Sequence, residues 1–453
     1  MPSLGLLSLG AVARDIGFEV GIFEACAGNK SHAEVLSQVK KVRPRVVGIT
    51  AVTLSIVSAG KLAKMIKDEL PGTMVIIGGP HFTAIPEETL KEFPSFDLGV
   101  IGEGEVTIKE LLPTLLSGSD LTDIKGLALR SGDNVVRTGK REFLMDLDTL
   151  PPPAWDLLEG FPREYVPASF RYRRLPAANL VVSRGCPNKC TFCDRSVFGN
   201  KIRSFSTDYF MKLLRDLKEN YGIREILFED DTFFLFKKRL AEMCRRMIEE
   251  RLDLSWSCLA RADLVDRDLL RLMKKAGCWQ VGYGIESADP GVLRLMKKNV
   301  SIEQVENAIN WTREAGILSK GFFMLGSPGE TRETFRRTVD FAKSIPLDDF
   351  SLFKTTPFPG SELYNMADEY GHFDRDWKRM NLLNTVFVPN GLTESEMDSM
   401  ALSAQREFYL RPRIIFSYIK RILSNPVFTG KIFSGVKAFI RNQLSGLKKR
   451  GEK

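Results

Sequence analysis

Short apolar runs rich in β-branched residues alternate with helical stretches over residues 1–139. Val46–Thr50, Met74–Gly78 and Leu98–Ile101 have the pattern of buried strands, whereas Val57–Leu70 has apolar residues at helical spacing. Each apolar run ends in a turn containing Gly or Thr, and a helix follows. This alternation predicts a parallel sheet with helices on both faces, so we expect a doubly wound, Rossmann-like α/β domain.

The same alternation recurs six times between about Asn179 and Tyr364. Six strand–helix units in one domain predict a partial (β/α)6 barrel, in which the loops that follow the strands carry the chemistry. The predicted strands are Leu180–Ser183, Glu225–Phe228, Ser255–Cys258, Gln280–Gly284, Gly321–Leu325 and Phe350–Lys354.

The remaining segments connect and extend these two domains. Ile124–Arg137 predicts a hairpin with its turn at Ser131–Asn134, and Pro151–Pro153 is a stiff spacer that cannot be helical. We therefore expect an α/β domain at residues 1–139, a linker at 140–178, the barrel at 179–364 and a helical C-terminal region with a basic tail at 365–453.

Positive charge is concentrated in that tail. The whole chain carries a net charge of +8, but residues 406–453 hold twelve Lys and Arg against two Asp and Glu. The preceding residues therefore carry a net charge of −2, and we expect no nucleic-acid partner. The sequence shows no signal-peptide pattern and no apolar run of membrane-spanning length, which predicts a cytoplasmic protein.

Three of the seven cysteines lie within eight positions, directly after the first barrel strand. Cys186, Cys190 and Cys193 have the spacing for three irons of one 4Fe–4S cluster, with the fourth iron left open. An open coordination position is typical of a catalytic metal centre. A structural zinc site is the alternative, but it would lack a fourth ligand and a nearby histidine. The other four cysteines are single and are expected to be small buried residues.

The turns at the strand ends of the first domain are rich in glycine. Ligands of open α/β sheets bind beyond the carboxyl ends of the strands, and glycine lets a backbone approach a bulky ligand closely. Three such turns in succession indicate a binding edge, although each one alone could be an ordinary tight turn. The candidate residues are Thr50, Gly78, Gly79, His81, Gly102 and Glu103.

The spacing C-x3-C-x2-C with Phe192 before the last cysteine resembles the signature of the radical SAM superfamily. The resemblance covers nearly the whole chain and extends to the branch with an α/β cobalamin domain before the barrel. It implies that Cys186, Cys190 and Cys193 hold the cluster and that S-adenosylmethionine (SAM) chelates the open iron. An electron from the cluster then cleaves SAM to methionine and a 5′-deoxyadenosyl radical, with Phe192 packed near the adenine.

Further segments resemble this family in the same order along the chain. Glu229 and Asp230 match the strand end near the SAM amino group, and Arg261 is a candidate partner of the SAM carboxylate. A helix cap is the alternative for Asp230, and a solvated position is the alternative for Arg261. The family's GIES and GxPGET segments correspond here to residues 284–287 and 326–331. The further SAM contacts that these matches imply are Glu286, Ser287, Gly326, Pro328 and Gly329.

The resemblance implies cobalamin at the strand ends of the first domain. The motif D-x-H-x-x-G is absent, so no axial histidine is expected. The chain also begins at the segment that follows the first strand in relatives, so the first strand is expected to be missing from this sequence. Either the true start lies upstream, or the cobalamin domain is incomplete and does not bind.

The expected reaction is methyl transfer to an unactivated carbon of a small-molecule substrate, with cobalamin carrying the methyl group and an external flavodoxin or ferredoxin supplying electrons. One open alternative is radical rearrangement, cyclisation or oxidation without methyl transfer. The other is a degenerate corrinoid- or redox-sensing binding module.

The basic tail contains apolar residues at helical spacing. Arg411–Leu423 and Phe433–Leu447 mix aromatic and aliphatic residues with Lys and Arg. This mixture is typical of a helix that lies on an anionic membrane, which would suit a lipid substrate. The tail therefore predicts peripheral membrane contact, with a helix packed on the barrel as the alternative.

Overall fold

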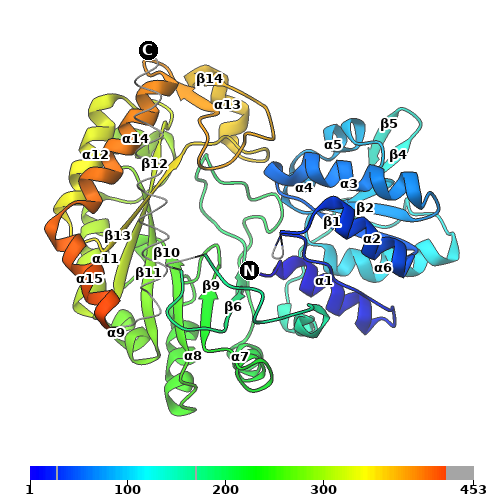
Figure 1. The fold of residues 1–453 in the computed structure, drawn as a ribbon, viewed down its shortest axis with the longest axis horizontal. Helices are drawn as coiled ribbons and strands as arrows, with labels where there is room; N and C mark the ends of the chain where they lie inside the picture. The colour runs from blue at the N-terminus through cyan, green and yellow to red at the C-terminus, as the bar shows by residue number, and fades with distance from the viewer. Residues whose placement is uncertain (27–28, 169–170, 425–453) are drawn as a thin grey trace.

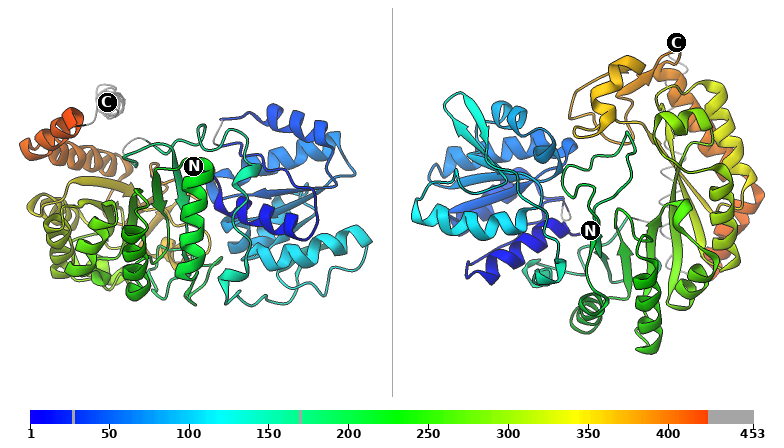
Figure 2. Two further views of the ribbon diagram at one scale, coloured as in Figure 1. Left: turned by 90° about the horizontal axis from the view of Figure 1, so that it is seen from below. Right: turned by 180° about the vertical axis from the view of Figure 1, so that it is seen from behind.

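The structure, a computed structural model, describes residues 1–26, 29–168 and 171–424. An N-terminal α/β domain lies beside a larger domain of barrel type, and the C-terminal region runs over and along that barrel (Figure 1). Figure 2 shows the same side-by-side arrangement from below and from behind. None of the described helices is both long enough and apolar enough to cross a membrane.

The N-terminal sheet has the strand order β1-β2-β3-β4-β5. Its first three strands pair in parallel, and the last two add an antiparallel hairpin, so the predicted strands and hairpin are confirmed. The strands are β1 (Val46–Thr50), β2 (Met74–Gly78), β3 (Leu98–Val100), β4 (Leu127–Ser131) and β5 (Asn134–Arg137). The helices are α1 (Leu4–Asp15), α2 (His32–Val42), α3 (Ile56–Glu69), α4 (Pro80–Ala84), α5 (Pro86–Glu92) and α6 (Gly104–Ser117).

Strand β2 is apolar along its whole length because both faces of the sheet are covered. Val75 and Ile77 pack in one core with Ile66 of α3, whereas Ile76 packs in a second core with Leu111 of α6. The parallel strands β1, β2 and β3 end on the same side. The turns that follow them (residues 50–54, 78–81 and 101–103) form the strand-end edge of this domain.

The barrel sheet has the order β13-β12-β11-β10-β9-β6, and every pairing in it is parallel. The predicted partial barrel is therefore confirmed. Its strands are β6 (Ala177–Leu180), β9 (Glu225–Phe228), β10 (Ser255–Ala260), β11 (Cys278–Glu286), β12 (Leu318–Leu325) and β13 (Asp349–Lys354). Its helices are α7 (Thr207–Tyr221), α8 (Lys237–Glu249), α9 (Arg267–Lys275), α10 (Pro290–Leu295), α11 (Ile302–Glu314) and α12 (Arg332–Ser344).

The first barrel strand begins three residues earlier than predicted. Ala177–Leu180 pairs with β9, and the chain then leaves the barrel sheet. Ser183–Arg184 instead forms a separate strand, β7, which pairs antiparallel with β8 (Arg203–Ser204). This small two-stranded sheet is the base of the segment that carries the three clustered cysteines.

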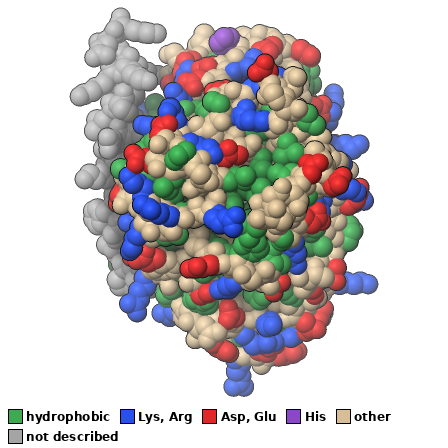
Figure 3. Space-filling model, turned by 90° about the vertical axis from the view of Figure 1, so that its right-hand side faces the viewer, with side chains coloured by type: hydrophobic (Ala, Val, Ile, Leu, Met, Phe, Trp, Pro, Cys, Tyr) green, Lys and Arg blue, Asp and Glu red, His purple; other side chains and the backbone are tan. Residues whose placement is uncertain are grey.

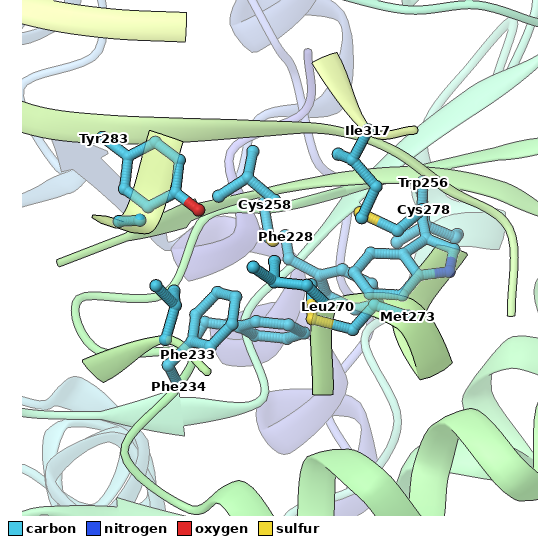
Figure 4. Packing of buried hydrophobic residues seen from close by; sticks show 14 of the residues in the cluster. Phe228, Phe233, Phe234, Trp256, Cys258, Leu270, Met273, Cys278, Tyr283 and Ile317 are labelled. Carbon is cyan, nitrogen blue, oxygen red and sulfur yellow. The ribbon is translucent and has the colours of Figure 1, made fainter. Parts of the chain in front are cut away.

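The barrel interior is one apolar cluster in which three of the single cysteines lie. Cys258 and Cys278 pack among Phe228, Phe233 and Trp256 (Figure 4). Cys244 is also buried, so these three cysteines are core residues as predicted. Cys26 differs from the prediction because it is exposed.

The C-terminal region and the first helix connect the two domains. Leu7 of α1 belongs to the apolar cluster of the barrel, and Trp377 packs against the cluster of the N-terminal domain. Helix α14 packs on β13 and on α12. The elements here are α13 (Glu362–Tyr370), β14 (Gly371–Phe373), β15 (Phe387–Pro389), α14 (Glu394–Tyr409) and α15 (Pro412–Ser424).

The outer face of the N-terminal domain carries both positive and negative side chains. Figure 3 shows Lys and Arg side chains intermixed with Asp and Glu around its margin, with hydrophobic side chains near its centre. The surplus of positive charge is therefore not gathered on this face.

Candidate functional site

The three clustered cysteines lie in the cysteine loop (residues 185–202), which joins β7 to β8. The loop is fixed at its start, because the Cys186 N–H donates to the Gly199 carbonyl at 3.2 Å and the Thr232 hydroxyl donates to the Gly185 carbonyl at 3.1 Å. Gly185 has a φ of +88°, and a Cβ there would lie 2.3 Å from the Lys201 carbonyl oxygen. Only glycine allows this close crossing of the two ends of the loop.

The three thiols are free and affect one another electrostatically. Desolvation, then Asp231 and the neighbouring thiols Cys186 and Cys190, raise the pKa of Cys193 to about 12. Burial raises the pKa of Cys190, although Lys298 and Arg261 oppose that change. Three thiolates side by side therefore need a compensating positive charge, which iron would supply.

The donor set fits a cluster better than a single ion. Among the described residues, no three His, Cys, Asp or Glu side chains converge on one point as the ligands of one metal ion would. A cubane cluster takes each thiolate on a different iron and so does not require such convergence. We conclude that Cys186, Cys190 and Cys193 suit a 4Fe–4S cluster.

A buried ion pair lies beside the cysteines, inside the barrel mouth. Lys298 Nζ donates to Glu286 Oε1 at 2.8 Å, and it lies 5.7 Å from the centre of the Phe192 ring. Glu286 has a φ of +65°, an unfavourable conformation for a side chain of its size, and the ion pair helps to hold it. The sequence predicted Phe192 and Glu286 here but missed Lys298, because one lysine within a basic run gives no signal.

Arg261 points at the cluster position and is not a solvated residue. Its guanidinium donates to Asp263 at 3.0 and 3.1 Å and to the Lys298 carbonyl at 3.0 Å. Its Nη1 also lies 3.9 Å from Cys190 Sγ. Arg261 and Lys298 therefore provide positive charge next to the thiols.

The acidic residues after β9 have different partners. Asp230 is buried and accepts hydrogen bonds from the Ser183 hydroxyl at 2.6 Å and the Val182 N–H at 3.0 Å, and burial raises its pKa to about 7. Glu229 pairs with Arg171 at 2.7 Å and accepts from Asn179 at 3.2 Å. Asp230 thus supports the base of the cysteine loop. Asp231, which the sequence analysis did not select, adds to the desolvation that raises the Cys193 pKa, as does Asp194.

The segments that match GIES and GxPGET are shaped by tight packing. The Ser287 hydroxyl lies 3.2 Å from Thr338 Oγ1 and accepts from the Asp289 N–H at 3.1 Å. A Cβ on Gly326 would lie 2.3 Å from Met397, and one on Gly329 would lie 2.6 Å from Leu295. These two glycines and the buried Pro328 between them hold the turn after β12 close to neighbouring side chains.

The six residues predicted for cobalamin all lie at the strand-end edge. Thr50 is exposed, and the exposed Val52 and Leu54 follow it, so this part of the edge offers apolar surface that suits the body of a corrin ring. Gly79 is needed for packing, because a Cβ there would lie 2.6 Å from Thr50 Oγ1. Gly78 and Gly102 are partly exposed in the neighbouring turns.

His81 and Glu103 already have protein partners. His81 is 1 % exposed, lies 3.2 Å from the Thr53 hydroxyl and contacts the Trp377 ring edge-on. Burial lowers its pKa to about 4, so the imidazole is neutral near neutral pH. Glu103 forms ion pairs with Arg184 and Arg203 from the two sides of the cysteine loop.

The strand-end edge lies directly against the cysteine loop. A Cβ on Gly102 would lie 4.0 Å from the Val197 carbonyl oxygen. A Cβ on Gly360 would touch both Asp194 of the loop and Ala84 of the N-terminal domain. The two sites predicted independently from the sequence therefore face one another.

Comparison with known proteins matches two different family models to two separate parts of the chain. Residues 180–342 match the Radical SAM superfamily, and residues 1–112 match the B12 binding domain. An uncharacterized methyltransferase of Pyrococcus horikoshii is 33% identical over 420 residues, which cover 92% of this chain and 90% of that protein. The anaerobic magnesium-protoporphyrin IX monomethyl ester cyclase of Rubrivivax gelatinosus is 28% identical over 399 residues, covering 86% of this chain and 70% of the cyclase.

Two solved structures share the fold. The radical S-adenosylmethionine methyltransferase TsrM of Kitasatospora setae, with cobalamin and a [4Fe-4S] cluster bound, matches with a TM-score of 0.67 at 21% identity over 81% of this chain and 72% of its own. The cobalamin-dependent radical enzyme OxsB, with aqua-cobalamin and S-adenosylmethionine bound, matches with a TM-score of 0.77 at 17% identity over 98% of this chain and 69% of its own.

Proposed function

Because this chain belongs to the radical SAM superfamily, in the branch that carries a B12-binding domain, we propose that it is a cobalamin-dependent methyltransferase acting on an unactivated carbon. One observation carries the proposal: the cysteine loop and the strand-end edge face one another, so a cluster-bound SAM and a cobalamin would share one reaction space. The relatives named as methyltransferases and the cofactors bound in TsrM and OxsB support the same assignment.

The chain's own residues divide the work in this proposal. Cys186, Cys190 and Cys193 bind the cluster, which when loaded supplies the electron that cleaves SAM. Arg261 and Lys298 lie where they can neutralise the SAM carboxylate. Asp231 offers carboxylate oxygens to its ammonium group.

The products formed from SAM test the proposal. Methyl transfer through cobalamin together with radical chemistry yields S-adenosylhomocysteine and 5′-deoxyadenosine, whereas other radical chemistry yields only the second product. We expect both products from protein reconstituted with iron, sulfide and hydroxocobalamin and supplied with an electron donor. Formation of 5′-deoxyadenosine alone would replace the proposal by a cyclase-type reaction, as the Rubrivivax relative suggests. If neither product formed, the protein would be a binding module.

We further propose that an external flavodoxin or ferredoxin supplies the electron. Outside the cysteine loop, Cys244, Cys258 and Cys278 are core residues of the barrel, and Cys26 is a single exposed thiol. Three of these four thiols are thus enclosed by apolar side chains and the fourth is single, so they give no support for a second cluster in the part of the chain that the structure describes.

The C-terminal helix leads us to propose contact with an anionic membrane surface from the cytoplasmic side. Ile414 of α15 is buried against the protein, but four large apolar side chains point outward. Arg413 and Lys420 lie exposed on the same helix. Apolar side chains next to cations fit an interface of acyl chains and anionic headgroups, which would suit an apolar substrate. The outward apolar residues are Ile415, Phe416, Ile419 and Leu423, exposed by 42%, 69%, 44% and 79%.

Vesicle flotation tests this contact. The full chain should float with vesicles containing phosphatidylserine at low salt, and Phe416→Asp should lower the bound fraction. Leu383→Asp is the matched control, because Leu383 is 73% exposed but lies in the loop between β14 and β15. Equal binding by the two variants would refute the contact.

A further inference from the structure

One carboxylate of the N-terminal domain, that of Glu103, forms ion pairs with both ends of the cysteine loop, and we call this arrangement the clamp. β7 and β8 pair antiparallel with Arg184 opposite Arg203, so the two arginines stand at the base of the loop. Arg184 Nη1 donates to Glu103 Oε1 at 2.9 Å, and Arg203 Nη1 donates to Glu103 Oε2 at 2.5 Å. Each oxygen of Glu103 therefore holds one end of the segment that carries the three cluster cysteines.

This clamp is buried and electrically balanced. The Arg203 side chain is 0% exposed and that of Glu103 is 8% exposed. A second carboxylate, Glu105, accepts from Arg184 Nη2 at 2.6 Å and from the Ser8 hydroxyl of α1 at 2.8 Å. Two cations thus meet two anions, and no net charge is buried.

Aromatic rings and carbonyl groups complete the surroundings of the arginines. The Arg184 guanidinium lies 5.3 Å from the centre of the Phe198 ring, and that of Arg203 lies 4.7 Å from the Phe143 ring. Arg203 also donates to the carbonyl groups of Leu144 at 3.2 Å and Phe198 at 3.0 Å. The clamp therefore joins the linker, the cysteine loop and the N-terminal domain at one point.

The role that best explains this buried network is to fix the relative positions of its residues, rather than to increase the stability of the fold. Burying ion pairs contributes little net stability, because desolvation offsets their attraction, whereas a satisfied network fixes one arrangement of its members. Glu103 directly follows Gly102 at the strand-end edge, where the proposed function places cobalamin. A shift of this turn on cobalamin binding would be transmitted through Glu103 to both ends of the cysteine loop.

We propose that Glu103, Arg184 and Arg203 are positioning residues that couple occupancy of the strand-end edge to the conformation of the cysteine loop, so that cobalamin and SAM bind cooperatively. The inference rests on the proposed function only for the location of the two sites. Coupling between two binding sites is reciprocal, so either ligand can report it.

Equilibrium binding of SAM tests the coupling without turnover. Protein with a reconstituted, oxidised cluster is titrated with SAM in the presence and absence of hydroxocobalamin, and the ratio of the two dissociation constants is the coupling factor. We expect a factor on the order of tenfold for the natural chain. Glu103→Gln keeps the size of the side chain but removes its charge, and its factor should fall close to one while the iron content is retained.

Two further variants make the result specific. Lys320→Gln breaks a partly buried ion pair, Lys320–Asp349 at 3.2 Å within the barrel sheet, and should leave the coupling factor unchanged. Arg184→Lys keeps the charge but loses the two-pronged geometry, and its factor should be intermediate. If the Glu103→Gln protein fails to load iron, the coupling factor of Arg184→Lys tests the inference instead.

Equal coupling factors in the natural chain and in the clamp variants would overturn the inference, as would the absence of coupling in the natural chain. Because no methyl transfer is needed, failure of the proposed reaction and failure of the coupling are distinguished.

Discussion

Glu330 of the turn after β12 is expected to make the stability of the protein depend on pH. The carboxyl group is 1 % exposed, and burial raises its pKa from an ordinary value near 4.5 to about 8. Its Oε2 accepts hydrogen bonds from the N–H groups of Gly326 and Ser327, at 2.5 and 3.3 Å. Its Oε1 has no partner among the described residues, so burial outweighs these two bonds and favours the neutral acid.

The sign and size of the effect follow from proton linkage. Between about pH 4.5 and about pH 8 the folded state holds a proton that the unfolded state has released, so the free energy of unfolding falls as pH rises. The slope is about 1.4 kcal/mol per pH unit, or about 2 kcal/mol between about pH 6 and about pH 7.5. For a cooperative unit of about 200 residues, this corresponds to a melting temperature lower by about 4–8 °C.

Glu330→Gln should remove this contribution, because the amide is neutral at every pH. Melting temperatures of the natural chain and the variant, followed by tryptophan fluorescence under nitrogen, should converge at low pH. Above about pH 8 the variant should be the more stable protein. Subtracting the two curves cancels the contributions of Asp230 and His81, which both proteins share. Glu333→Gln is the control, since Glu333 is exposed nearby, and identical pH slopes for the natural chain and Glu330→Gln would refute the reasoning.

Two further predictions concern the site itself. Gly185→Ala should prevent cluster loading, because its Cβ would lie 2.3 Å from the Lys201 carbonyl oxygen. Gly132 also has a positive φ but has open space around it, so Gly132→Ala should load a full complement of iron. Equal iron contents in the Gly185→Ala and Gly132→Ala proteins would contradict this account. Lys298→Met should lower the free energy of unfolding by about 3–5 kcal/mol, because it leaves the buried Glu286 carboxylate unpaired. Chemical denaturation should show that adding Glu286→Gln restores most of the loss, and a single-variant loss below about 1 kcal/mol would be inconsistent with the buried pair.

Much of the fold could be predicted because its signals are local. The strands β1, β2 and β9 have the bounds that were predicted for them, because short runs rich in apolar residues mark parallel strands. None of the residues of β1 is buried, so the local pattern located this strand but not its exposure. The start of β6 was missed because Ala177 and Ala178 have weak strand propensity, and pairing with β9 determines their conformation. The three cluster cysteines could also be predicted from a local signal, because all of them lie within one loop and their spacing can be read directly from the sequence.

The parts of the site that escaped prediction depend on contacts between distant segments. Lys298 is significant only because Glu286 and Phe192 lie beside it, and Trp377 only because it covers His81. Glu103 was predicted for cobalamin from its position in a glycine-rich turn. The structure pairs it with two arginines about eighty and one hundred residues away. Ion pairs of this kind leave no periodic pattern in a sequence.

The most direct test of the central claim is the iron content and SAM cleavage of a variant with Cys186, Cys190 and Cys193 all replaced by Ala. Anaerobic reconstitution of the natural chain should give about four irons per protein and 5′-deoxyadenosine from SAM under a strong reductant. Cys26→Ala, which removes the exposed thiol outside the cysteine loop, should behave like the natural chain. The triple variant should retain neither iron nor cleavage, and formation of 5′-deoxyadenosine by that variant would contradict the account.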